Sequence, residues 1–428
     1  MGVNPTAPPP HPVTAPAHAA TDGNRPPPIP RPVPPPICAS PRIARLTADL
    51  AAGRAGALPA FWAEVAAAGT PLAEPPPDGG GGVVLTFLWR SADAAEVVLL
   101  ANKLADRHDP AASRMRRLGG ADVWHLSYRL PADWRGSYHV AVRAAPGGRP
   151  TLHPDPHNAD RLPQSAGPPR SIAEAPAAAA APRWWEPRPG TPAGAIAPVA
   201  VDGRRVWRYL PPAGGSPAAA AGGDATGAGP LPVLVLLDGD IWGPLLPVAP
   251  LLDNLIHAGR LPPLAALLPD SGGPAARAAD YTCSEAYADW LAALVPAALG
   301  DRATADPDRT IIAGQSLGGL AAVHAGLRAP HRFGRVLAQS GAFWWPSAPA
   351  GAAEWLTRYV AATPRRPIRL HFEVGTDEWV NRPPLDRLRA ALAARGYPVT
   401  HREFAGGHDR ACWRADLADA LTTLHTDP

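Results

Sequence analysis

Residues 311–319 read IIAGQSLGG, and this stretch decides the fold class that we predict. The run RTIIA before Ser316 is β-like, and GGLAAVHAGL after it is helical in composition, so the chain turns from a strand into a helix at the serine. Glycines two positions before and two positions after Ser316 remove side chains that would clash in so tight a turn. The context predicts an exposed, fixed nucleophile, whereas the alternative is a glycine-rich turn with an incidental serine.

A serine hydroxyl is a weak nucleophile unless a base takes its proton, so a histidine is required within reach. His408 lies in FAGGHDRACWR, between a predicted last strand (VTHREF) and a predicted last helix (DLADALTTLH). This is a loop beyond a strand end, where an α/β fold gathers its site, and the chain order serine, acid, histidine also favours a late histidine. We therefore predict that His408 is the base. Four other histidines fit less well: His324, His331, His371 and His401.

The acid that orients the histidine is sought in the stretch HFEVGTDEW, residues 371–379. Glu373 lies within the predicted strand, whereas Asp377 and Glu378 follow Gly375 in the loop. One buried carboxylate is needed to orient an imidazole, and its neighbour would be solvated. We favour Glu378, with Asp377 as the second choice, and a Ser/His pair without an acid remains an alternative.

Two backbone N–H groups are expected to stabilise an oxyanion. The N–H of Leu317 begins the helix after the serine, where the helix terminus favours negative charge. The second donor should come from the loop after an early central strand, LDGDIW at residues 237–242, and the N–H of Asp240 or Ile241 is expected there. The alternative for this loop is a plain strand-end turn.

The order of strand and helix patterns predicts the architecture. From Leu231 onward, apolar strands such as LPVLVLLDGD, LAALLPD and FGRVLAQSG alternate with helical stretches such as SEAYADWLAALVPAAL. This alternation predicts an α/β fold with a mostly parallel central sheet. Between Val83 and Ala144, short runs such as VVLTFLWR and ADVWHLSYRL have no helix between them, so they predict a small antiparallel β-sandwich of immunoglobulin-like type.

Four segments follow from these patterns and from the distribution of the 58 prolines. We predict a disordered Pro/Ala-rich tail at 1–41, a β-sandwich domain with short leading helices at 42–144, a Pro/Ala-rich linker at 145–198 and an α/β-hydrolase domain at 199–428.

Composition excludes several classes of protein. The net charge of +3, from 40 basic and 37 acidic residues, is too small to suggest a nucleic-acid partner. Three cysteines do not make a disulfide framework and fit a reducing compartment. The N-terminus lacks the pattern of a signal peptide, and no uninterrupted apolar run reaches the length of a membrane span, so we expect a soluble, cytoplasmic protein. The proline-broken stretch LHPDPHNAD lacks ligand spacing, and no metal or cofactor is expected.

Several motifs in both halves of the chain resemble the enterochelin esterases, the ferric enterobactin hydrolases related to esterase D. The first half carries TFLWR and DVWHLSYRLPADWRGSY, and the second half carries LLDGDIW, AGQSLGGLAAVHAGLRAPHRFGRVLAQSGAFWWP, EVGTDE and GGHDRACWR. The last motif is especially specific, because general demands of a fold give little reason for it. The long Pro/Ala tail and linkers and the Asp377-Glu378 pair depart from the family pattern, and the pair leaves the acid open.

The resemblance implies hydrolysis of the serine ester bonds of a cyclic tri-catecholate siderophore, with iron arriving bound to the substrate. It places Ser316 and His408 at the positions of nucleophile and base, and Glu378 at a loop carboxylate. Flat aromatic anions favour aromatic walls and guanidinium groups. The expected substrate contacts are Trp242, Trp344, Trp345, Trp413 and Arg414, with Arg135 from the first domain, although core packing is the alternative for each tryptophan.

Two other functions stay open at this point. A general aryl or feruloyl-type esterase, or an acyltransferase, would use the same three residues, because only the pocket separates these activities. A ligand-binding protein with an inert hydrolase domain is the non-enzymatic alternative, and the intact Ser316 and His408 argue against it.

Overall fold

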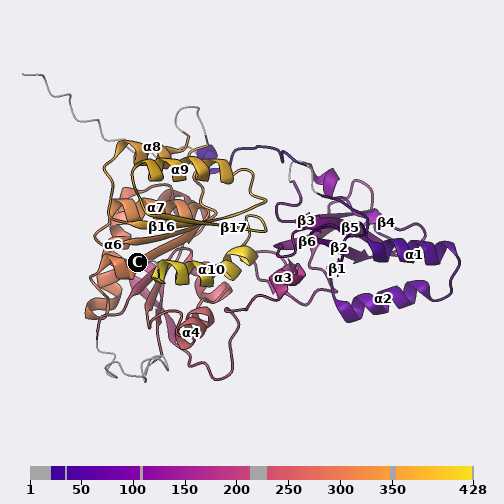
Figure 1. Cartoon of the computed structure of the whole chain (residues 1–428), viewed down its shortest axis with the longest axis horizontal. Helices are drawn as coiled ribbons and strands as arrows, with labels where there is room; N and C mark the ends of the chain where they lie inside the picture. Colours follow the sequence, from indigo (N-terminus) through magenta and orange to yellow (C-terminus); the bar gives the residue numbers. More distant parts are fainter. Residues whose placement is uncertain (1–20, 34–35, 107–108, 213–228, 348–352, 427–428) are drawn as a thin grey trace, which may run out of the picture.

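The computed structural model describes residues 21–33, 36–106, 109–212, 229–347 and 353–426. They form two lobes side by side, an N-terminal β lobe and a C-terminal α/β lobe (Figure 1). No helix within these described ranges combines the length and apolar character of a membrane span. Residues 1–20 of the predicted tail and most of the glycine-rich stretch before Leu231 lie outside the described residues.

The N-terminal lobe contains two antiparallel sheets that share one apolar core. Phe87 of the first sheet packs edge-on against Tyr138 of the second, with ring centroids 4.9 Å apart. The first sheet has the order β1 (Leu72–Glu74), β2 (Val83–Arg90), β5 (Val123–Leu130) and β4 (Arg116–Arg117). The second has the order β3 (Glu96–Ala101), β6 (Arg135–Arg143), β9 (Arg170–Glu174) and β8 (Arg161–Leu162), with β7 (Thr151–His153) also paired to β6.

Two helices lead into this lobe, α1 (Pro41–Ala51) and α2 (Ala57–Ala68). Helix α1 begins where Ser40 accepts a hydrogen bond from the Ile43 N–H, as an N-cap serine does. Their apolar faces pack on the outer side of the first sheet and form a small core of their own with Leu72, Leu88 and Val123.

The C-terminal lobe is built on one sheet of eight strands. The order is β10 (Ala195–Val201), β11 (Arg204–Leu210), β13 (Ala265–Pro269), β12 (Val233–Leu236), β14 (Thr310–Gln315), β15 (Arg335–Gln339), β16 (Arg369–Gly375) and β17 (Val399–Phe404). The six strands from β13 to β17 are parallel, and the antiparallel pairings are those of β11 with its two neighbours, β10 and β13. The sheet is therefore mostly parallel, as the alternation of patterns predicts.

Helices cover both faces of this sheet, and its central strands β12 to β15 are buried almost throughout. Along β12, Val233 and Val235 belong to one core, and Leu234 and Leu236 belong to the other. The first core is covered by α6 (Glu285–Leu299), α7 (Leu317–Arg328), α8 (Trp355–Ala362) and α9 (Arg382–Ala394). The second is covered by α4 (Ala249–His257) and α10 (Arg410–Thr426), and α5 (Pro274–Tyr281) follows β13. Short helical turns complete the chain: η1 (Thr21–Asn24), η2 (Pro110–Ser113), α3 (Pro176–Ala179), η4 (Ile241–Leu245), η5 (Gly300–Arg302) and η6 (Pro307–Arg309).

The segment 145–198 differs from the plain linker that its composition predicts. It contributes β7, β8 and β9 to the second sheet of the N-terminal lobe and the start of β10 to the large sheet. Trp184 and Trp185 pack against the core beside α4 and α10. The three strands in the N-terminal lobe are only two to five residues long and lie between prolines. Segments this short show no alternation of apolar and polar residues that would have predicted strands from the sequence.

Residues 21–33, which we call the N-terminal arm, also differ from the predicted disordered tail. The arm runs from beside α8 and α9 across to the N-terminal lobe (Figure 1). The Asn24 Oδ1 accepts a hydrogen bond of 2.7 Å from the Trp345 indole, and the Ile29 carbonyl accepts one of 2.8 Å from the Trp379 indole. An extended, proline-rich chain leaves its carbonyl groups without partners inside the segment. The indole N–H groups of buried Trp345 and half-buried Trp379 both find their acceptors on the arm.

Candidate active site

Ser316 stands between β14 and α7 with φ of 59° and ψ of −122°. This left-handed φ is unusual for a residue with a side chain, and strain of this kind is often stored at functional sites. The surroundings fix it, because the Ser316 N–H donates to the Gln339 carbonyl and its own carbonyl accepts from the Ala342 N–H. A Cβ on Gly314 would overlap the carbonyl oxygen of Gly318, so the turn can close only with glycine at that position.

His408 brings its ring to this serine from the loop between β17 and α10. Its Nε2 lies 3.0 Å from the Ser316 Oγ, which is hydrogen-bonding distance. The ring packs edge-on against Trp413 with centroids 4.8 Å apart. The carbonyl of His408 accepts a hydrogen bond of 2.7 Å from Asn102 of the N-terminal lobe. The N-terminal lobe thus helps to hold the loop that carries the imidazole.

Glu378 contacts the other nitrogen of the same imidazole, with 2.7 Å between Oε2 and Nδ1. Its side chain is completely buried, and each carboxylate oxygen has two donors. Oε1 accepts from the Ser340 hydroxyl at 2.5 Å and from the Gly375 N–H at 2.9 Å, and Oε2 accepts from Asn381 at 2.6 Å as well as from His408. Burial alone would raise the pKa of this carboxyl, but His408 and the hydrogen bonds outweigh it and the pKa is lowered. Glu378 is therefore ionised.

Asp377, the second candidate for the acid, points elsewhere. Its carboxylate accepts a hydrogen bond of 3.0 Å from the Trp134 indole and lies 3.5 Å from the Arg31 guanidinium. Burial raises the pKa of this carboxyl, and these two partners offset the effect only in part. Asp377 ties the loop to the N-terminal lobe and the arm, while its neighbour Glu378 faces His408.

The expected oxyanion donors belong to two segments, the start of α7 and the loop after β12. Leu317 is the first residue of α7, so its N–H has no acceptor within the helix. In the loop after β12, the N–H of Ile241 is engaged, because it donates to the Asp238 carbonyl at 2.9 Å. Ile241 is thus not available as a donor, and the N–H of Asp240 is the candidate that remains from this loop.

A pocket of about 730 Å³ opens over Ser316 and His408 between the two lobes. Three guanidinium groups line it: Arg277 from α5, Arg410 from α10 and Arg170 from β9. Asp238 holds Arg277 with two hydrogen bonds, of 2.6 and 2.8 Å. Burial lowers the pKa of Arg410, and Asp238 and Arg277 act on it in opposite directions. Asp238, Asp240 and Asp409 also line the pocket, so its lining carries both charges, and Asp238 already pairs with Arg277.

The sequence analysis missed these three arginines. Arg410 stands two residues after His408 in the GGHDRACWR motif, and that position could have predicted that it lies near the site. Arg277 and Arg170 come from a helix and a short strand far from Ser316 along the chain, and no local pattern marks them.

The tryptophans predicted to contact substrate divide into two groups. Trp242 and Trp413 line the pocket. Trp344 is buried behind the site and donates to the Asn381 Oδ1 at 3.0 Å, and Trp345 is buried against the N-terminal arm. Neither Trp344 nor Trp345 reaches the pocket, because their strand-end loop turns into the core beside α8.

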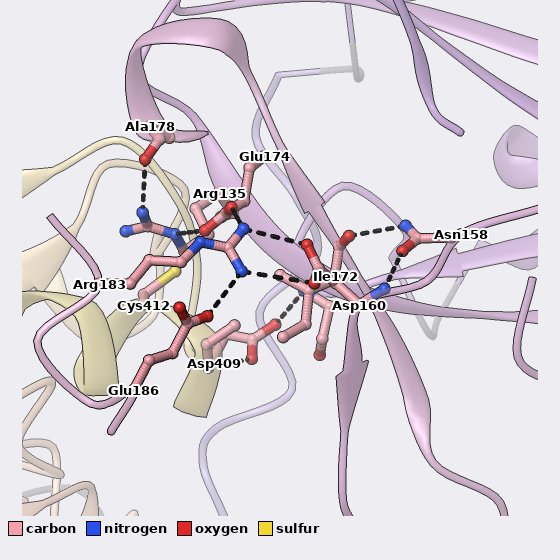
Figure 2. Close-up of polar contacts among 12 residues, drawn as sticks. Arg135, Asn158, Asp160, Ile172, Glu174, Ala178, Arg183, Glu186, Asp409 and Cys412 are labelled. Atoms are coloured by element: carbon pink, nitrogen blue, oxygen red, sulfur yellow. Dashed lines mark hydrogen bonds and ion pairs between the residues drawn. The ribbon is translucent and has the colours of Figure 1, made fainter. Parts of the chain in front are cut away.

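The two arginines predicted to bind substrate also lie away from the pocket. Arg135 donates to Glu174 at 2.6 Å and to the Ala178 carbonyl at 2.9 Å, within a network that includes Arg183 (Figure 2). Burial lowers the pKa of Arg414 to about 10, and its guanidinium lies 4.6 Å from the ring centroid of Trp185. Neither side chain lines the pocket over Ser316.

No group of three or more His, Cys, Asp or Glu side chains within the described ranges is arranged to hold a metal ion. In the stretch LHPDPHNAD, Asp155 is buried and accepts hydrogen bonds from Thr70 and Tyr138. It is a structural residue of the N-terminal lobe.

Comparisons with known proteins match both lobes. The family model "Enterochelin esterase, N-terminal" matches residues 84–185, and the model "Putative esterase" matches residues 223–424. The iron(III) enterobactin esterase of Dickeya dadantii is 34% identical, over 86% of this chain and 93% of that protein.

Solved structures agree with this match. The ferric enterobactin esterase of Salmonella typhimurium has a TM-score of 0.71 at 29% identity, covering 86% of this chain and 98% of that one. The enterobactin esterase of Shigella flexneri, determined in the presence of 2,3-dihydroxy-N-benzoyl-serine, has a TM-score of 0.68 at 27% identity, covering 85% and 97%. With both lobes matched in order, the chain belongs to the iron(III) enterobactin esterase family.

Proposed function

We propose that this protein is a serine esterase that hydrolyses the ester bonds of a ferric catecholate siderophore of the enterobactin type and so releases its iron. The observation that carries the proposal is the continuous contact from Ser316 through His408 to Glu378, inside a pocket lined by three guanidinium groups. Membership of the enterobactin esterase family supports the substrate class.

The first half of the reaction forms an acyl-enzyme. The Ser316 Oγ attacks the ester carbonyl carbon while His408 Nε2 takes the hydroxyl proton, and Glu378 stabilises the imidazolium that results. We expect the N–H groups of Leu317, at the start of α7, and of Asp240 to stabilise the oxyanion. The ester C–O bond then breaks, and the leaving serine hydroxyl of the siderophore takes the proton from His408.

The second half returns the enzyme to its starting state. Water attacks the acyl carbon, His408 takes a proton from that water, and the bond to Ser316 breaks as the serine regains its proton. The product is a 2,3-dihydroxybenzoyl-serine unit with a free carboxylate. No step needs a metal or cofactor held by the protein, because the iron is cargo of the substrate.

The pocket supports a catecholate as the group that is bound. A volume of about 730 Å³ lies in the usual range for small-molecule sites, roughly 300–1,000 Å³. Trp242 and Trp413 offer aromatic surface, and Arg170, Arg277 and Arg410 offer positive charge to catecholate oxygens. A simple aryl ester would use the same three catalytic groups but would gain little from the arginines.

Product analysis by mass spectrometry tests the proposal. The wild-type protein should convert ferric enterobactin into linear and monomeric 2,3-dihydroxybenzoyl-serine, and Ser316→Ala should release none. The rate constants for the siderophore and for p-nitrophenyl acetate are then compared. A strong preference for the acetate would reject the siderophore and favour a general aryl esterase, and full activity in Ser316→Ala would reject the enzyme mechanism.

A further inference from the structure

A second cavity, of about 640 Å³, adjoins the pocket over Ser316. Asn102, Arg170 and His408 line both, so the two spaces meet at the catalytic imidazole. Hydrolysis at Ser316 uses only the first pocket, so the second cavity has no role in the reaction steps themselves. Its position makes it accessible to a part of the substrate that lies beyond the ester under attack.

The N-terminal arm forms one wall of this cavity, through Pro26, Pro27 and Ile29. Several contacts hold this part of the arm in place. Trp379 donates to the Ile29 carbonyl at 2.8 Å, Arg31 lies 3.5 Å from Asp377, and the Arg31 N–H donates to Asp106 at 3.0 Å. Since Asp377 and Trp379 flank the catalytic Glu378 in the chain, the wall is tied directly to the loop of the active site.

The chemistry of the lining fits a flat aromatic anion. Ile29, Leu100 and Val380 provide apolar surface, and Trp379 provides an aromatic ring. Lys103 and Arg170 provide two positive charges against one carboxylate, Asp106. The Lys103 ammonium lies 4.7 Å from the ring centroid of Trp379, so positive charge and aromatic surface stand together. A dihydroxybenzoyl group needs both of these features.

We propose that this cavity is a second aryl subsite, which binds a catecholate arm of the siderophore other than the one whose ester is attacked, and that the N-terminal arm of the protein forms its wall. The inference rests on the proposed function, because it assumes a substrate with several catecholate arms. The subsite would favour a triester over a single-armed ester, since only the triester fills both spaces.

Charge substitutions at Ile29 test the subsite. Ile29→Asp places a negative charge in the wall, and it should raise the KM for the metal-free trilactone about tenfold, because like charges repel at close range. Ile29→Lys loses the same apolar contact but should leave the KM unchanged or lower it. Val33→Asp is the matched control: Val33 is an exposed residue of the same arm that does not line the cavity, and its substitution changes net charge equally.

Binding of the metal-free trilactone to Ser316→Ala protein, by titration calorimetry, separates the subsite from the hydrolysis. Ile29→Asp should weaken binding in that background and Ile29→Lys should not. Equal losses from both substitutions would mean that Ile29 only stabilises the arm, and the subsite would be rejected, as it would be if Ile29→Asp had no effect. If the wild-type protein cleaves no trilactone but the two variants still differ in binding, the proposed function fails and the subsite stands.

Discussion

Replacing Glu378 by glutamine is the sharpest test of the catalytic geometry, because every position around this carboxylate is occupied by a donor. At Oε1 the Gly375 N–H is fixed in the backbone, and at Oε2 both His408 and Asn381 approach within 2.7 Å. An amide has one oxygen and one NH₂ group. In Glu378→Gln, the NH₂ either faces the Gly375 N–H, where two donors meet, or faces His408 and Asn381, where His408 must change tautomer to accept at Nδ1.

The expected loss of kcat/KM follows from the more favourable of these two arrangements. If the amide oxygen stays with Gly375, the NH₂ donates to His408 Nδ1 and leaves the ring proton on Nε2, where the Ser316 proton has to be accepted. The comparable substitution in a serine protease triad costs about 10⁴ in kcat. At 1.36 kcal/mol for each tenfold change, we expect kcat/KM to fall by a factor of about 10³–10⁴, or roughly 4–5.5 kcal/mol. The unpaired buried donor should also lower stability by about 1–3 kcal/mol.

The assay compares Glu378→Gln with Asp377→Asn, which removes a charge at the adjacent position. Initial rates with the siderophore and with p-nitrophenyl acetate give kcat/KM, and thermal unfolding checks that each variant is folded. Asp377→Asn should keep activity within about tenfold, because Asp377 contacts Trp134 and Arg31 and not His408. If Asp377→Asn caused the thousandfold loss and Glu378→Gln did not, the assignment of the acid would be refuted, and small losses from both would indicate a Ser/His dyad.

Three further expectations concern the pocket, the turn and the buried carboxyls. Arg410→Met should raise the KM for catecholate esters by about 10- to 100-fold, with a much smaller change for p-nitrophenyl acetate, since a charged contact in a pocket contributes roughly 1.5–3 kcal/mol; equal changes for both esters would contradict its role toward the catecholate. Gly314→Ala should give insoluble or poorly folded protein, because its Cβ would overlap the Gly318 carbonyl, and a well-folded, active variant by circular dichroism and initial rates would show that the turn can relax. Burial and, to a smaller extent, the charge of Glu373 raise the pKa of Asp416 to about 7. The folded protein therefore keeps a proton on Asp416 that the unfolded chain loses near pH 4, so stability should decline as the pH rises from about 4 to 7. Asp416→Asn should make the Tm nearly independent of pH over that range. An unchanged Tm profile in that variant would assign the pH dependence to other groups.

The position of Ser316 in a strand–helix turn was predictable because its signal is local. Glycine is required at position 314, two residues before Ser316, because a Cβ there would overlap the backbone of Gly318. The central sheet was predictable for a similar reason, since β12 alternates between two apolar cores and therefore has no polar face. Steric and burial requirements such as these act over a few neighbouring residues, so they are visible as local sequence patterns.

The choice between Asp377 and Glu378 could not be made from the sequence. Adjacent side chains of a loop point in different directions, and the direction depends on the register of the turn, which here is set by hydrogen bonds from the Asp377 N–H to Gly406 and from the Glu378 N–H to Gly375. Two partners of Glu378, Ser340 and His408, come from segments at least 30 residues away in the chain. Spacing alone does not encode which of two neighbouring carboxylates those segments will meet.

The pocket arginines and the arm were missed for a related reason. Arg170 lies in a short strand within a proline-rich stretch, and the arm has a composition that usually predicts disorder. Their order comes from tertiary partners: β6 pairs with the strand of Arg170, and two indole N–H groups bind the arm. Conversely, Arg135 was expected at the site because ligands often bind where two domains meet, but its side chain donates to Glu174 instead.

The two lobes are best understood as one catalytic unit, because the contacts between them converge on the loop of His408. Asn102 holds the carbonyl of His408 at 2.7 Å, and Asp409, the next residue, accepts a hydrogen bond of 2.6 Å from the Ser137 N–H of β6. Imidazole placement tolerates little error, since displacement by about 1 Å can cost a hundredfold in rate. A C-terminal lobe alone would carry Ser316 and Glu378 in place but would lose both of these restraints on the base. The N-terminal lobe therefore contributes to the reaction through the position of His408 as well as through the wall of the pocket.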